Sequence, residues 1–342
     1  MNPPLIVSWL LWPLSLIYGA WTKLRAWAYR RGLVKSKRVE GIVISVGNLT
    51  TGGTGKTPTA LWLALHAADA GQRAAILLRG YGSRGEADSH GQPRSDEAAL
   101  LRDRLAGRAQ LGIGADRVAS AEALARHGVT WFVLDDGFQH FKLRRDVDIV
   151  LLDASRPFGN GRLLPAGPLR EPRSALGRAD IILITRSEHA PALETSVRRH
   201  TKAPVFYAHA RLDGLYRSPQ RAVALPEADW RRGKFFAFAG IGNPAAFFDD
   251  LGRWGVPLAG TRAFRDHHRY TPTDLAQLER VAEEKSVDAL VCTEKDVYNL
   301  GDISGLRLPI YAACISMVID AHERFWESIC GVANRRANQA AR

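Results

Sequence analysis

The chain has 342 residues, of which 46% are hydrophobic, 8% aromatic and 24% charged, and its net charge is +12. This length and composition predict about two folded domains and exclude a disordered or fibrous protein, while the charge predicts an anionic substrate or partner. The three cysteines lie far apart, at positions 292, 314 and 330, which argues against a disulfide scaffold and against a zinc site made of cysteine pairs.

The first 39 residues combine an apolar run with a basic cluster. Residues 5–21 contain no charged side chain, and seven Lys and Arg residues but no acidic one lie between positions 23 and 38. Because the basic cluster follows a tryptophan-rich run, the pattern favours an anionic membrane surface and predicts no nucleic-acid partner. A cleaved signal peptide is not expected, because its charges would come first. We expect a membrane-associated helix on the cytoplasmic face, with a buried domain helix or a single span as alternatives.

A phosphate-binding loop is predicted after the first β-branched run. Residues 41–49 read GIVISVGNL, and the next segment reads TTGGTGKTPTALWLALHAADAG. A strand, a glycine-rich loop and a helix in this order surround phosphates with N–H groups and with the positive end of the helix. Lys56 is expected at the β- and γ-phosphates and Thr57 on magnesium. The residues expected to contact the nucleotide are Thr50, which stands where the usual pattern has glycine, Thr51, Gly52, Gly53, Thr54, Gly55, Lys56 and Thr57.

Two later apolar runs end in carboxylates that are candidates for binding magnesium. WFVLDDG ends with Asp135 and Asp136, and DIVLLDA ends with Asp153. Aspartates at strand ends are also ordinary turn formers. The adjacent pair is preferred, because two neighbouring carboxylates concentrate the negative charge that a cation compensates.

Further apolar runs at residues 74–78, 149–152 and 181–185 alternate with helical patterns. This alternation predicts a doubly wound α/β domain with a mostly parallel sheet, of the P-loop NTPase type. Residues 156–180 are rich in Gly, Pro and Arg and too long for a simple connector, so we expect them to shape a site.

The rest of the chain predicts a smaller α/β domain. Apolar runs at residues 234–239, 289–293 and 309–313 are typical of strands, and residues 273–285 have a helical pattern. The expected organisation is an N-terminal membrane-associated helix and basic segment at 1–39, a nucleotide-binding domain at 40–215, and a smaller domain at 216–342 that closes over the active site.

Two polar clusters are candidates for a base that activates an acceptor hydroxyl. Asp96 lies in S-D-E at the start of a helical stretch, where a carboxylate can also simply cap the helix. His267 lies in R-D-H-H-R-Y, where adjacent histidines can act as a base, bind a metal or line a surface. Residues 293–296 read TEKD, which differs from the guanine-reading N-K-x-D loop because the Lys and Asp are adjacent, so no guanine specificity is predicted.

Eight motifs follow one another between residues 45 and 296, within matches that run from about residue 5 to 300. They read SVGNLTTGGTGKTP, LLRGYGS, SDEAALL, VLDDGFQH, LLPAGPLREP, FAGIGNP, FRDHHRYT and CTEKD. This order resembles the tetraacyldisaccharide 4'-kinases, the lipid A 4'-kinases of Gram-negative bacteria. The resemblance implies transfer of the γ-phosphoryl group of ATP to the 4'-hydroxyl of a tetraacylated glucosamine disaccharide 1-phosphate, at the inner face of the inner membrane.

The resemblance also implies roles for single residues. It implies that Asp96 and His267 act together on the acceptor hydroxyl, and that Asp136, with Asp135 beside it, binds magnesium. The residues that it adds to the nucleotide site are Tyr81 and Glu171.

ATP and Mg²⁺ are therefore the expected cofactors, and the expected partners are the glycolipid and an anionic membrane surface, with no obligate protein partner evident. Because Asp96 and His267 fall in different predicted domains, we expect the pair to form only across the cleft between domains, so that domain closure gates the reaction. The alternatives are a membrane-docked regulatory P-loop ATPase that acts on a protein partner, and a non-catalytic adaptor that keeps the nucleotide-binding fold.

Overall fold

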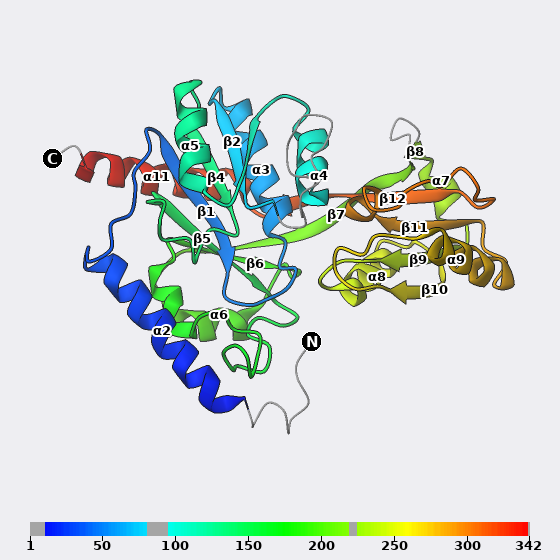
Figure 1. Ribbon diagram of the computed structural model, residues 1–342, viewed down its shortest axis with the longest axis horizontal. Coiled ribbons are helices and arrows are strands. Elements are labelled where there is room, and N and C mark those ends of the chain that lie inside the picture. The colour runs from blue at the N-terminus through cyan, green and yellow to red at the C-terminus, as the bar shows by residue number, and fades with distance from the viewer. Residues whose placement is uncertain (1–10, 81–94, 219–223, 341–342) are drawn as a thin grey trace. The chain divides into compact units, whose positions relative to one another are not determined.

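The computed structural model describes residues 11–80, 95–218 and 224–340 (Figure 1). Contacts divide the chain into two compact units. The first unit comprises the described residues up to Arg79, Leu105–His209 and the described residues from Met317 onward. The second comprises the described residues of Gly80–Arg104 and Ala210–Ser316.

The first unit is built around a parallel sheet with the strand order β3-β2-β4-β1-β5-β6-β7. The strands are β1 (Ile42–Asn48), β2 (Ala74–Leu78), β3 (Gln110–Ile113), β4 (Trp131–Asp135), β5 (Val147–Asp153), β6 (Ile181–Thr185) and β7 (Val205–Arg217), which continues into the second unit. The helices are α2 (Trp12–Arg30), α3 (Lys56–Asp69), α5 (Arg117–Arg126), the 3-10 helix η1 (Arg173–Arg178), α6 (Pro191–Arg198) and α11 (His322–Ala340).

Helices cover both faces of this sheet, as a parallel sheet requires. Every residue of β4, β5 and β6 is buried. Helix α3 packs on β1, β2 and β4, and α11 packs on β5. One core cluster joins β5 and β6 to Leu49, Phe138 and Leu169, which belong to the loops that follow the strands. The core therefore extends up to the loops that carry polar side chains.

The second unit has its own parallel strands in the order β10-β9-β11-β12, with β12 next to β7 and β8 antiparallel to β7. The strands are β8 (Ala224–Leu225), β9 (Phe235–Ala239), β10 (Leu258–Ala263), β11 (Ala289–Thr293) and β12 (Ile310–Ile319), which continues into the first unit. The helices are α4 (Asp96–Leu105), α7 (Glu227–Trp230), α8 (Pro244–Arg253), α9 (Pro272–Glu284) and α10 (Glu294–Val297).

Alternate residues of β9 feed two core clusters on opposite faces. Phe235 and Ala237 pack with residues of α8, whereas Phe236 and Phe238 pack with residues of α9. Side chains of a strand point alternately to its two faces, so the second unit has one helix layer on each side of its sheet.

The predicted fold class is confirmed, because two α/β units with parallel sheets are present. The strands expected at residues 74–78, 181–185 and 289–293 have those bounds as β2, β6 and β11. The division of the chain differs from the boundary expected between residues 215 and 216. Gly80–Arg104 belongs to the second unit, and residues from Met317 onward return to the first. The reason for the return is that β12 continues into the first unit and leads into α11, whose Phe325 is buried there.

Helix α2 packs on the first unit through small and polar residues. Its buried residues are Ser15, Gly19 and Thr22. The Ser15 hydroxyl donates to the Leu163 carbonyl at 3.0 Å and accepts from the Ala166 N–H at 3.0 Å. Most of its large apolar residues are exposed, namely Trp12, Leu14, Leu16, Ile17, Trp21, Leu24 and Trp27.

This arrangement is the reverse of a surface helix in a globular protein, which turns its apolar face to the core. The alternative of a buried domain helix therefore does not describe α2. Within the described part of the chain, no helix has the length and apolar character needed to cross a membrane. Residues 5–10 of the predicted apolar segment lie outside the described residues.

We predict that Phe325→Ala destabilises the first unit by about 3–5 kcal/mol, because removal of a fully buried phenylalanine leaves a cavity. The measurement is the free energy of unfolding from urea denaturation. Arg324→Ala, at the exposed neighbouring position of α11, should change it by less than about 0.5 kcal/mol. A loss below about 1 kcal/mol for Phe325→Ala would show that α11 contributes little to the core of the first unit.

Candidate functional site

The loop between β1 and α3 has the form expected for a phosphate site. Gly55 has a φ of +86°, in the left-handed region that favours glycine, and it directly precedes the first residue of α3. No side chain caps the N-terminus of α3. A Cβ added at Gly52 or Gly53 would meet no atom within 4 Å, so the space beside these residues is open. An anion can therefore approach the first N–H groups of α3.

Thr50 and Thr54 hold the loop from the inside. Both side chains are buried, and the Asn48 side-chain amide donates to the Thr54 hydroxyl at 3.0 Å and to the Thr50 hydroxyl at 3.5 Å. The threonine at position 50, where the usual pattern has glycine, is thus part of an internal hydrogen-bond network. Sequence reasoning did not select Asn48, although it is the last polar residue of the predicted strand.

The Gly-, Pro- and Arg-rich segment lies against this loop. Leu169 forms an antiparallel bridge with Thr50, the Thr51 N–H donates to the Pro168 carbonyl at 2.8 Å, and the Arg170 N–H donates to the Leu49 carbonyl at 2.7 Å. These backbone contacts fix the loop and place the Arg170 side chain beside the end of β4. The segment therefore packs directly against the loop.

Two cations surround the Asp136 carboxylate. Arg170 Nη1 donates to both of its oxygens, at 2.8 and 2.7 Å, and Lys56 Nζ lies 3.6 Å from Oδ1. Lys56 also donates to Asn48 Oδ1 at 3.3 Å. Burial raises the pKa of Asp136, but the charges of Lys56 and Arg170 outweigh it and the pKa is lowered. Asp136 also has a φ of +52°, a costly conformation for a non-glycine residue that is common at functional sites.

Asp135 is the carboxylate that meets Thr57. The Thr57 hydroxyl donates to Asp135 Oδ2 at 2.9 Å. Asp153, the other candidate from the sequence, accepts from the Ser155 N–H and hydroxyl and lies 3.2 Å from Arg186 Nε. Asp153 therefore acts as a turn former, the alternative to a magnesium ligand. Of the candidate carboxylates, Asp135 is the one that is hydrogen-bonded to Thr57.

The remaining residues assigned to the nucleotide site differ in placement. The buried Glu171 carboxylate forms a bidentate pair with Arg178, at 2.8 and 2.9 Å. This pair anchors the segment that carries Arg170. Tyr81 lies outside the described residues.

Asp96 and His267 form a pair inside the second unit. His267 Nδ1 lies 3.0 Å from Asp96 Oδ2 and 3.2 Å from Oδ1. The Asn299 side-chain amide donates to Asp96 Oδ2 at 3.0 Å, and the Glu97 N–H donates to Oδ1 at 2.8 Å. The expectation that the pair forms only across a cleft between domains is wrong, because α4 belongs with the second unit up to Arg104.

The pKa values of the pair are shifted in opposite directions. Burial raises the pKa of Asp96, but the hydrogen bond from His267 and the charge of Lys295 outweigh it, so the pKa is lowered. The hydrogen bond to Asp96 raises the pKa of His267. Sequence reasoning did not select Lys295 and Asn299, just as it did not select Asn48 and Arg170. The available signal for Lys295 was the TEKD motif.

The backbone of His267 is held in an unusual conformation. Its φ is +56°, and its N–H donates to the Gly240 carbonyl at 2.9 Å. Gly240 itself donates to Asp296 Oδ1 at 2.8 Å. A Cβ at Gly240 would lie 3.0 Å from the His268 Cβ, so a side chain here would crowd the loop that carries His267. The loop after β10 is thereby fixed on the end of β9.

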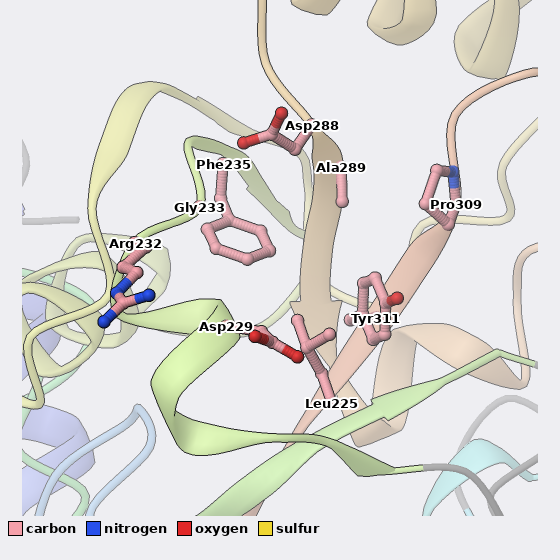
Figure 2. A pocket seen from close by; sticks show the side chains of 9 residues that line it. All are labelled: Leu225, Asp229, Arg232, Gly233, Phe235, Asp288, Ala289, Pro309 and Tyr311. Carbon is pink, nitrogen blue, oxygen red and sulfur yellow. The ribbon is translucent and has the colours of Figure 1, made fainter.

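A cavity of about 350 Å³ lies elsewhere in the second unit. Figure 2 shows its lining, in which the rings of Phe235 and Tyr311 face the space near Asp229 and Asp288. Phe235, Ala289 and Tyr311 belong to the beginnings of β9, β11 and β12. Since Asp96 and His267 adjoin the opposite ends of these parallel strands, the cavity is separate from the pair.

Comparisons with known proteins identify relatives along most of the chain. The family described as tetraacyldisaccharide-1-P 4'-kinase (LpxK) matches residues 7–333. Tetraacyldisaccharide 4'-kinase of Syntrophus aciditrophicus is 40% identical over 91% of this chain and 89% of its own length. The enzyme of the same name from Geobacter metallireducens is 40% identical over 91% of this chain and 94% of its own length. The crystal structure of LpxK from Aquifex aeolicus in complex with ATP has a TM-score of 0.72 and 27% identity, covering 95% of this chain and 99% of that one.

The opposite pKa shifts predict a pH-dependent contribution of the Asp96–His267 pair to stability. Because the pKa of Asp96 is lowered in the folded state, this carboxylate stabilises the fold above about pH 4. Because the pKa of His267 is raised, this histidine stabilises the fold fully below about pH 6.5, and its contribution is lost as the pH rises through its folded-state pKa. The loss of unfolding free energy in His267→Gln should therefore be larger at pH 5.5 than at pH 9. Urea denaturation of both proteins at the two pH values measures this difference. An equal loss at both would contradict the ion pair.

Proposed function

The chain belongs to the tetraacyldisaccharide-1-P 4'-kinase family, and from this premise we propose how its residues transfer the γ-phosphoryl group of ATP to the 4'-hydroxyl of a tetraacylated glucosamine disaccharide 1-phosphate. The observation that carries the proposal is the presence of two chemically complementary groups. The first unit has a phosphate loop with Lys56 and Thr57, and the second has the Asp96–His267 pair. None of the comparisons favours a regulatory ATPase.

The donor set of the first unit fits ATP with magnesium. Mg²⁺ bound with a nucleotide needs only one or two protein oxygens, because phosphates and waters supply the rest. Among the described residues, no group of three or more His, Cys, Asp or Glu side chains is placed to hold a metal ion. Thr57 and Asp135, already joined at 2.9 Å, would hold Mg²⁺, which when bound offsets the charge of the phosphates.

We assign the carboxylate of the metal site to Asp135 rather than to Asp136, which the sequence favours. Asp136 is engaged by Arg170 and lies near Lys56. In this arrangement Asp136 orients two cations beside the phosphate loop. Lys56 and Arg170 then supply positive charge where negative charge develops during phosphoryl transfer.

The acceptor side of the reaction belongs to the second unit. The Asp96 carboxylate accepts the proton of the 4'-hydroxyl as that oxygen forms its bond to the γ-phosphorus and the bond from the γ-phosphorus to ADP breaks. His267 donates its Nδ1–H to Asp96 and orients the carboxylate, and Asn299 donates to the same carboxylate. The lowered pKa of Asp96 keeps this base ionised at neutral pH.

The pattern of α2 supports a membrane surface as the place of this reaction. The apolar side chains of α2 are exposed, and the basic cluster lies in its second half and in the residues that follow. Arg25 lies over the Trp21 ring at 5.6 Å and Arg31 over the Trp27 ring at 5.9 Å. Tryptophan favours the interface of a bilayer and arginine favours lipid phosphates. We therefore place α2 flat on the cytoplasmic face of the inner membrane, where the acyl chains of the substrate reside.

Asp96→Asn should lower kcat by about 10²- to 10⁴-fold, since the amide cannot accept the proton, with little change in the KM for ATP. The measurement is transfer of labelled γ-phosphate from ATP to the tetraacylated disaccharide 1-phosphate in detergent micelles. Asp302→Asn removes one carboxylate from an exposed position of the second unit and should leave kcat unchanged. Full activity of Asp96→Asn would refute the assignment of the base.

The double variant Ile17→Glu, Leu24→Glu should bind anionic phospholipid vesicles at least about tenfold more weakly, because it removes two apolar side chains that are 67% and 62% exposed and adds two negative charges. Co-sedimentation with the vesicles measures binding. Gln72→Glu, Asn338→Glu adds the same charge at exposed positions of the first unit and serves as the control. Equal binding of both double variants would show that α2 is not the membrane contact.

A further inference from the structure

In the TEKD segment at residues 293–296, Thr293 and Asp296 have structural roles, whereas Lys295 faces the Asp96–His267 pair. Thr293 and Asp296 form a capping box at the start of α10. Asp296 also accepts from the Gly240 N–H at 2.8 Å, which ties the segment to the loop that carries His267. The segment is therefore rigidly placed, and Lys295 projects from it.

Lys295 lies beside both members of the Asp96–His267 pair. Its Nζ is 3.3 Å from Glu97 Oε1, 3.6 Å from Asp266 Oδ1 and 4.0 Å from Asp96 Oδ2. The same atom is 3.4 Å from His267 Nε2. Only 16% of the side chain is exposed, so these contacts are little screened by solvent.

The two ring nitrogens of His267 face opposite kinds of partner. Nδ1 faces the ionised Asp96 carboxylate, which only accepts, so Nδ1 carries a hydrogen. Nε2 faces the Lys295 ammonium group, which only donates, so Nε2 carries none. Asp266 Oδ1 is 3.9 Å from Nε2, beyond hydrogen-bond distance. Neutral histidine in its Nδ1–H tautomer satisfies both contacts, and the Lys295 ammonium group opposes the second proton that the Asp96 carboxylate favours.

We propose that Lys295 is a positioning residue of the phosphoryl transfer: its ammonium group opposes a proton on His267 Nε2, so that the neutral ring carries its hydrogen on Nδ1, keeps Asp96 ionised, and so sets the pH below which the pair stops working. This inference rests on the roles proposed above for Asp96 and His267. The capping box of the TEKD segment does not involve the side chain of Lys295.

The balance of charge around the pair gives the direction of the effect. Asp96 and Glu97 come from α4, Asp266 from the loop after β10, and Lys295 from α10. Without the lysine, the charged groups that remain within 4 Å of the imidazole ring, among the described residues, are the carboxylates of Asp96 and Asp266, and these stabilise the protonated form. The pKa of Asp96 would rise as well. Because loss of the lysine raises the pKa of both groups, the apparent pKa of the coupled pair rises whichever group takes the proton.

The first test is the pH profile of kcat/KM for the glycolipid kinase reaction. In Lys295→Met the acidic limb should move to higher pH by roughly one unit or more. Lys295→Arg, which keeps the charge, should return the limb to within a few tenths of a unit of the wild-type position. Lys285→Met removes an exposed lysine of the same unit and should not move it. Since all four proteins act on the same substrates, titration of substrate phosphates cancels. A folded Lys295→Met protein with the wild-type limb would overturn the proposal.

The second test does not depend on turnover or on a stable variant. ¹⁵N NMR of the histidine-labelled wild-type protein, with His267→Gln to assign the signal, reports which ring nitrogen carries the hydrogen. We expect a protonated Nδ1 and an unprotonated Nε2 at pH 9, where the imidazole ring is neutral. Hydrogen on Nε2 would overturn the proposal even if Lys295→Met fails to fold. If the expected tautomer is found but Asp96→Asn keeps full activity, the effect of Lys295 on His267 stands. The proposed role of Asp96 as the base is then refuted.

Discussion

The direction of parallel strands determines where the polar residues of both units gather. In a parallel sheet, the loops that follow the strands all lie at one edge. The phosphate loop follows β1 and Asp136 follows β4 in the first unit. In the second unit, Gly240 follows β9, His267 follows β10 by a few residues and Lys295 follows β11. Residues that are distant in the sequence therefore meet through a backbone constraint that their own side chains do not need to create.

Charge compensation then decides how each cluster behaves. Buried carboxylates are costly unless a cation or hydrogen-bond donors accompany them. Asp136 is accompanied by Arg170 and Lys56, and Asp96 by His267, Asn299 and Lys295. The same neighbours that permit burial also keep the carboxylates ionised, as the lowered pKa values show. In the proposed function, the proton acceptor and the anion site are thus prepared before any substrate arrives, which is the meaning of preorganisation in catalysis.

The sequence predicts local features well and long-range pairing poorly. Apolar runs locate β2, β6 and β11, and glycine spacing locates the loop before Lys56, because each depends on neighbouring residues. The assignment of Asp96 to the unit of His267 depends instead on distant contacts such as Arg104 with the buried Glu294, at 3.1 Å. Likewise, hydropathy identifies α2 as apolar but does not show that Ser15 and Gly19 face inward. Arg170 was within a segment expected to shape a site, yet only the folded chain brings it to Asp136.

The reversed face of α2 affects how the purified protein behaves in solution. Several exposed tryptophan, leucine and isoleucine side chains on one helix form the kind of apolar surface that promotes association in water. In buffer without detergent, copies of the chain can shield these side chains from water by associating through α2. A dimer or larger species seen by gel filtration under such conditions would then reflect missing lipid rather than a functional assembly. The number of chains that work together should be counted in a membrane-mimicking environment.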